Sequence, residues 1–161
     1  MRRFAALALL PASISISFGG NLDVAKLRKA LVNVAHKDYP GLTVGAPTCP
    51  GKVKLKKGTV TTCTIAVSDA TLTYRVTQTD SKGNVDILPA QALLIVSKLE
   101  ALVVGAVEKA TGEKATASCG TAKVLAVAPG KTVRCEAETT SNRATITALV
   151  EDVEGNVHIT G

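Results

Sequence analysis

An internal repeat constrains what this chain can fold into more than any other feature of its sequence. At an offset of 72 residues the chain matches itself in an ordered series of positions. The matching pairs are Leu22 with Leu94, Val24 with Val96, Lys26 with Lys98, Leu27 with Leu99, Val32 with Val104, Lys37 with Lys109, Gly58 with Gly130, Cys63 with Cys135, Thr73 with Thr145, Asp80 with Asp152, and Gly83-Asn84-Val85 with Gly155-Asn156-Val157. Cys49 matches Cys119 at an offset of 70, so the second copy is two residues longer between its cysteines. Because such a series seldom aligns in order by chance, the sequence predicts a tandem duplication, with copies at residues 21–90 and 91–161.

The four cysteines offer the cross-links that two such small domains require. A domain of about 70 residues buries only about 60% of the surface that its unfolded chain exposes, so an additional staple is expected. If each copy folds as a unit, Cys49 pairs with Cys63 and Cys119 pairs with Cys135. Each disulfide then closes a loop of roughly fifteen residues and stabilises its domain by about 3 kcal/mol. The alternative, a four-cysteine zinc site, lacks C-x-x-C pairs and would draw its ligands from both copies.

Residues 1–20 have the layout of a secretory signal peptide. Arg2 and Arg3 form a basic start, an uncharged and largely apolar stretch runs from Phe4 to Phe18, and two glycines follow. The stretch is too short to span a membrane and contains Pro11, so no transmembrane segment is expected. The alternative is an uncleaved buried or interfacial helix. A signal peptide predicts a secreted or cell-surface protein, in a compartment where cysteines form disulfides.

Each copy is predicted to be α+β, with one N-terminal amphipathic helix packed on a small antiparallel sheet. Apolar residues recur at helical spacing over residues 22–37 and 94–109. Alternation with a period of two follows, and a short strand before each first cysteine makes the sheet about four-stranded. The expected strands are residues 42–44, 59–67, 72–76 and 84–88 in the first copy, and 114–117, 133–137, 144–150 and 157–159 in the second. The disulfide would join the first strand to the second.

The order of these features resembles a known family of exported domains. In the first copy the amphipathic helix is followed by Cys49-Pro50, Gly58, Cys63, an alternating hairpin and a closing Gly-x-Val strand. This pattern is similar to the actinobacterial domain of unknown function 4333, and it recurs in the second copy with Gly120 in place of Pro50. The resemblance implies an exported, disulfide-bonded domain in two tandem copies. It implies no activity, since none is assigned to the family.

The sequence contains no recognisable catalytic or metal-binding motif, so we expect neither an enzyme nor a cofactor. His36 and His158 have no partner of their own type at metal-ligand spacing. No Gly-x-Ser-x-Gly, P-loop or His-Glu-x-x-His motif occurs. The second copy has acidic residues in its predicted strands and turns, where a solvated strand face is expected rather than catalytic carboxylates; they are Glu136, Glu138, Glu151, Asp152 and Glu154.

The two copies differ mainly in charge. Residues 21–90 carry ten Lys or Arg and five Asp or Glu, a net charge of +5, whereas residues 91–161 carry seven and eight, a net charge of −1. Much of the excess lies in Lys52, Lys54, Lys56 and Lys57, of which the first three would share one face of a strand. Such a face is a candidate contact for anionic cell-envelope polymers, lipid headgroups or an acidic protein partner. The alternative is a lysine-rich edge that protects a strand from aggregation.

Taken together, these features predict a non-enzymatic binding or structural module, secreted or at the cell surface, with an unidentified ligand. Nucleic acid is not an expected partner, because the lysines lack interleaved aromatic residues for base stacking. The alternative function is a secreted inhibitor of another enzyme. Such an inhibitor would bind its target through the sheet surface of the tandem repeats.

Overall fold

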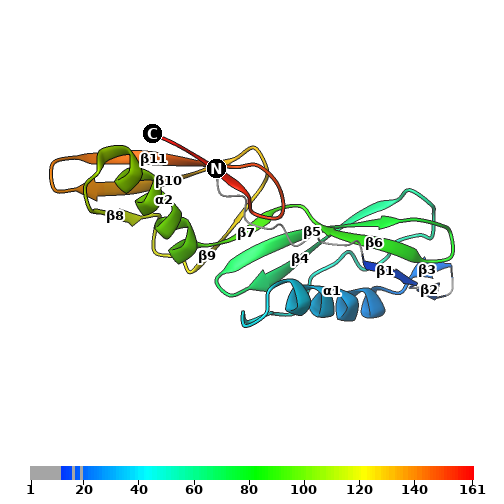
Figure 1. Ribbon diagram of the computed structural model, residues 1–161. Helices are drawn as coiled ribbons and strands as arrows, with labels where there is room; N and C mark the ends of the chain where they lie inside the picture. Colours follow the sequence, from blue (N-terminus) through cyan, green and yellow to red (C-terminus); the bar gives the residue numbers. More distant parts are fainter. Residues whose placement is uncertain (1–11, 16, 19) are drawn as a thin grey trace. The chain divides into compact units, whose positions relative to one another are not determined.

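Figure 1 shows the computed structural model, which describes residues 12–15, 17–18 and 20–161. The chain is α+β and divides into two compact units, with the boundary between Ala90 and Gln91. Most of the predicted signal peptide, residues 1–11, lies outside the described residues. Within the described part of the chain, no helix is long and apolar enough to cross a membrane.

The first unit contains a four-stranded antiparallel sheet in the order β1-β6-β5-β4. These strands are β1 (Ala12–Ser15), β4 (Val60–Val67), β5 (Ala70–Gln78) and β6 (Asn84–Pro89). Alternate residues of β4 and β5 are buried, as the period of two predicts. Tyr74, on β5, is among the largest fully buried side chains of the protein.

Helix α1 (Val24–Asp38) lies along one face of this sheet (Figure 1). Leu27, Leu31 and Ala35 follow one another at a spacing of four residues and are fully buried. Asp23 caps the helix, because its side chain accepts a hydrogen bond from the backbone N–H of Lys26 at 3.0 Å. The helix is therefore held both by its apolar stripe and by a capped N-terminus.

The second unit has the same class of architecture. Its four-stranded antiparallel sheet has the order β12-β11-β10-β8, and helix α2 packs on β8 and β10. The elements are α2 (Val96–Thr111), β8 (Ala115–Ser118), β10 (Thr132–Thr139), β11 (Arg143–Val150) and β12 (Val157–Thr160). Leu99 and Val103 anchor the helix in a core that also contains both cysteines of the unit, Cys119 and Cys135.

Short strands precede both helices, where the helical periodicity had been extended too far. Leu22, in β3 (Asn21–Leu22), pairs with β2 (Ser17–Phe18), and Leu94 lies in β7 (Ala92–Ile95), which pairs with β9 (Val124–Val127). A spacing of two residues between apolar side chains at a helix start suits a strand as well as a helix. The periodicity alone therefore placed these boundaries two residues early.

The fourth strand of the first sheet comes from an unexpected segment. The predicted strand at residues 42–44 forms only an isolated bridge, Val44 with Val67, and Thr48 forms another with Thr64. Gly45 and Pro47 interrupt this segment, and proline has no N–H to give to a ladder. The outer strand beside β6 is instead β1, whose residues we had assigned to the apolar stretch of the signal peptide. In the second unit, β8 contains neither glycine nor proline and pairs with β10.

Several backbone hydrogen bonds recur at positions 72 residues apart. The recurring pairs are Gly58 N–H to Gln78 O (2.8 Å) and Gly130 N–H to Val150 O (2.7 Å), Gln78 N–H to Thr59 O and Val150 N–H to Lys131 O (both 2.9 Å), and Thr79 N–H to Asn84 O and Glu151 N–H to Asn156 O (2.9 and 2.8 Å). In the turns before β6 and β12, an aspartate side chain accepts bonds from an asparagine four residues on. The two units thus use the same bonds to close the corresponding turns.

Candidate functional site

The four candidate lysines lie on an extended stretch, residues 52–57, which we call the lysine segment. Lys52, Lys54 and Lys56 are exposed, whereas Val53 between them is buried and Leu55 is half-buried. This alternation places the three lysines on the outer side of the segment, as the sequence predicted. Lys57 is exposed in the turn that follows. No carboxylate of the described residues forms an ion pair with any of the four ammonium groups.

Backbone hydrogen bonds fix the lysine segment along the residues that precede α1. Leu22 donates its N–H to the carbonyl oxygen of Val53 at 2.8 Å, and Leu55 donates to that of Gly20 at 3.3 Å. An antiparallel bridge joins Asn21 to Lys54. The segment is thus held as a strand-like stretch although it carries a dense positive charge.

Each unit contains the disulfide predicted for it. Cys49 is bonded to Cys63 and Cys119 to Cys135, with sequence separations of 14 and 16 residues. All four cysteines are buried, and no cysteine of the chain is free. The protein in this form therefore has no thiol to act as a nucleophile or a metal ligand.

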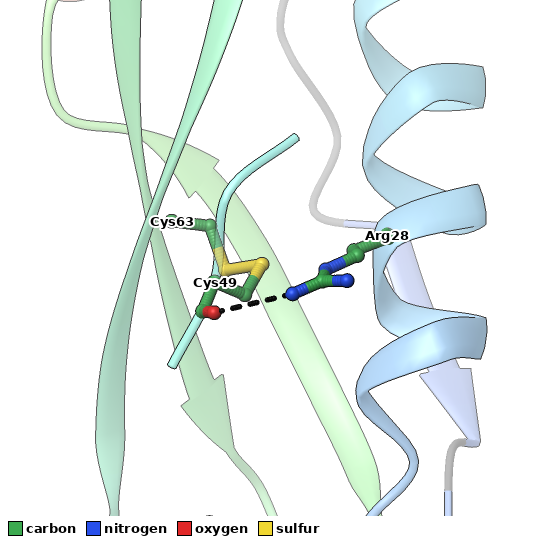
Figure 2. Close-up of a disulfide and its surroundings, with 3 residues drawn as sticks. All are labelled: Arg28, Cys49 and Cys63. Carbon is green, nitrogen blue, oxygen red and sulfur yellow. Dashed lines mark hydrogen bonds between the residues drawn. A yellow bond between two sulfur atoms is a disulfide. The ribbon is translucent and has the colours of Figure 1, made fainter. Parts of the chain in front are cut away.

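A charged side chain of each helix contacts the backbone of a disulfide cysteine, and the two units use opposite charges for it. On α1, Arg28 donates a hydrogen bond to the carbonyl oxygen of Cys49 at 3.5 Å (Figure 2). On α2, Glu100 accepts a hydrogen bond from the backbone N–H of Cys119 at 2.9 Å. Arg28 and Glu100 are 72 residues apart. The surroundings of the first disulfide are therefore basic and those of the second acidic.

A buried cluster that the sequence did not single out lies at the C-terminal end of α1. Tyr74 is fully buried, and its hydroxyl forms no hydrogen bond with the described residues. Burial, reinforced by the nearby Asp38 carboxylate, raises the pKa of Tyr39 to about 12. Burial also raises the pKa of Tyr74, as do the neighbouring Tyr39 and Asp38. Both hydroxyls are therefore protonated at neutral pH, which makes them poor candidates for a general base.

Residues considered for metal or acid–base chemistry lie apart from one another. His36 is exposed on α1 and His158 is exposed on β12. Glu136 accepts a hydrogen bond from the Thr145 hydroxyl at 2.8 Å, and Glu138 forms an exposed ion pair at 3.8 Å with Arg143.

The remaining acidic candidates lie in the turn between β11 and β12. Burial acts to raise the pKa of Asp152, but hydrogen bonds from the side chain and backbone of Asn156 outweigh it and lower the pKa. Glu151 and Glu154 are exposed in the same turn. Among the residues that the structure describes, no group of His, Cys, Asp and Glu is arranged to hold a metal ion.

Comparison with known proteins gives one finding. Residues 6–83 match the family described as Domain of unknown function (DUF4333). No curated protein and no solved structure matches the chain. The match includes α1, the Cys49–Cys63 disulfide, the lysine segment and the β4–β5 hairpin, and it ends one residue before β6. The part of the chain from residue 6 to residue 83 therefore belongs to the DUF4333 family, the family that the sequence pattern resembles.

Proposed function

We propose that the protein is an exported, non-enzymatic module of the cell surface or secreted fraction. Its first unit would bind an anionic cell-envelope polymer through Lys52, Lys54, Lys56 and Lys57. Export is supported by the basic and then apolar N-terminus and by two disulfides, which form in oxidising compartments. A non-enzymatic role is supported by the scattered titratable groups of the described residues and by the absence of a free cysteine.

We further propose that the two units arose by tandem duplication of one α+β domain. The helices begin 72 residues apart, at Val24 and Val96. Strands β4 and β10 both begin and end 72 residues apart. The recurring hydrogen bonds and the placement of both disulfides support the same relation. Differences between corresponding positions of the two units then become informative about function.

The observation that carries the binding proposal is the difference between the lysine segment and its counterpart in the second unit. At an offset of 72, Lys54, Lys56 and Lys57 correspond to Ala126, Ala128 and Pro129. The fold of the unit therefore does not require lysine at these positions. Exposed ammonium groups without carboxylate partners repel one another and are free to interact with a polyanion.

The test is retention of the full chain on isolated cell-wall fragments at low ionic strength. The variant combines Lys54→Glu, Lys56→Glu and Lys57→Glu, and we expect it to abolish retention. The matched control combines Lys29→Glu, Lys37→Glu and Lys82→Glu, which changes the net charge equally at exposed positions elsewhere in the first unit. The control should remain bound. Unchanged retention of the first variant, or equal loss in both, would refute a contact at the lysine segment.

A further inference from the structure

A buried glutamine holds the lysine segment from the side opposite to β3. Gln78, the last residue of β5, is only 1% exposed. Its side-chain oxygen accepts a hydrogen bond from the backbone N–H of Lys56 at 3.0 Å. Its side-chain nitrogen donates to the carbonyl oxygen of Lys54 at 2.9 Å. One amide thus binds both backbone groups around Leu55, so Lys54 and Lys56 are fixed relative to each other.

The fold itself does not need this glutamine. The corresponding residue of the second unit is Val150, which is fully buried and cannot form either bond. There, the corresponding stretch is the apolar strand β9, paired with β7. Burying an amide costs free energy unless it is hydrogen-bonded, and a valine at the same position avoids that cost. The glutamine and the lysines occur together in one unit and are both absent from the other, which links Gln78 to the charged segment rather than to the sheet.

The geometry of the segment defines a spacing between charges. In an extended chain, residues two apart lie on the same side and about 6.6–6.8 Å apart. Lys54 and Lys56 therefore present two ammonium groups on backbone positions held at this interval, with Lys52 continuing the row. A polymer with one phosphate for every six backbone bonds, as in a chain of glycerol phosphate units, has an extended repeat of roughly 7 Å by the same bond lengths. The two spacings match.

On the basis of the proposed function, we infer that the lysine segment is a preorganised row of charges for an extended phosphodiester polymer of polyol units, and that Gln78 is its positioning residue. Because the backbone is fixed before binding, less conformational entropy is lost when the lysines meet successive phosphates. A lipid surface presents phosphates that move independently. It therefore gains little from a fixed spacing, and the two sources of phosphate are distinguishable.

The test uses the full chain and two probes, a fluorescently labelled glycerol phosphate polymer and phosphatidylglycerol vesicles. Gln78→Val, the residue found at the corresponding position, should weaken polymer binding roughly tenfold and leave vesicle binding unchanged. The control Thr61→Val alters a buried residue of β4 that forms no hydrogen bond with the lysine segment, and it should change neither affinity. Melting curves establish that binding is measured on folded protein.

A second variant leaves the buried glutamine intact. Lys56→Thr combined with Thr71→Lys keeps the net charge but moves one ammonium group from the segment to an exposed position on β5. It should also weaken polymer binding selectively. Wild-type affinity for the polymer in both variants, or equal loss on polymer and vesicles, overturns the inference. If the triple lysine variant still abolishes retention, the proposed function survives that result. If the triple variant also binds normally, both proposals fail.

Discussion

The two tyrosines make the first unit sensitive to alkaline pH in a way that can be calculated. Tyr39 and Tyr74 are the only tyrosines in the chain, and both lie in the first unit. Below the pKa of an unfolded tyrosine, about 10, both states are protonated and the stability is complete. Between pH 10 and the folded value for Tyr39, about 12, the unfolded state ionises and the folded state does not. The free energy of unfolding therefore falls as the pH rises through this interval.

The magnitude follows from the separation of the two pKa values. A shift of one pH unit corresponds to about 1.36 kcal/mol, so Tyr39 alone removes about 2.7 kcal/mol by pH 12. The raised pKa of Tyr74 acts in the same direction. A domain of this size has a total stability of roughly 4–10 kcal/mol. We therefore expect the first unit to unfold before its tyrosines ionise freely.

The assay follows phenolate absorbance and circular dichroism together as the pH is raised. Phenolate should form in one cooperative step that coincides with partial loss of secondary structure, because only the first unit contains the chromophore. Tyr39→Phe removes the contribution of that residue and should move the step to higher pH. Reversible ionisation of either tyrosine near pH 10, with the circular dichroism unchanged, would refute the burial argument.

Three further predictions concern the stability of the two units, each measured by urea denaturation of purified protein. Opening the second disulfide by Cys135→Ser should lower the free energy of unfolding of its unit by about 3 kcal/mol, since the bond spans 16 residues, and an unchanged midpoint would contradict this. Leu27→Ala and Leu99→Ala remove buried side chains of corresponding helices and should each cost about 2–5 kcal/mol, so a loss confined to one helix would argue against equivalent packing. Glu100→Ala should cost about 1 kcal/mol because it leaves the Cys119 N–H without its acceptor, whereas Arg28→Ala removes a longer bond and should cost less; the reverse order would contradict the distances.

Much of the architecture could be predicted because it depends on local periodicity. The alternation of buried residues defined β4 and β5, and the repeat led to both disulfide pairings. The edge strand β1 could not be predicted, because its pairing with β6 joins residues about 70 apart and its composition is typical of a signal peptide. The apolar content of a segment does not determine which backbone it will pair with.

The exposed lysines of the candidate site were predictable, but the residue that holds them was not. Lys54 and Lys56 stand out in the sequence by charge. Gln78 lies more than twenty residues away in a strand of alternating apolar residues, where a glutamine resembles an exposed strand residue. Comparison with Val150 through the repeat was the one sequence feature that could have drawn attention to it. That comparison shows a polar residue at a position that is apolar in the other copy.

The pairing of β1 with β6 sets an order of events for a secreted chain. Residues 12–15 cannot be threaded through a translocation channel and serve as a sheet strand at the same time, so secretion must come before closure of the first sheet. If a peptidase then removes the leader after residue 20, the outer edge of β6 loses its neighbour. The second unit shows what such an edge looks like: Val85 and Ile87 are buried beside β1, whereas Val157 and Ile159, their counterparts on β12, are half-exposed where no described strand pairs with the outer edge. Leader removal would thus convert a finished sheet into one that can be extended by another strand.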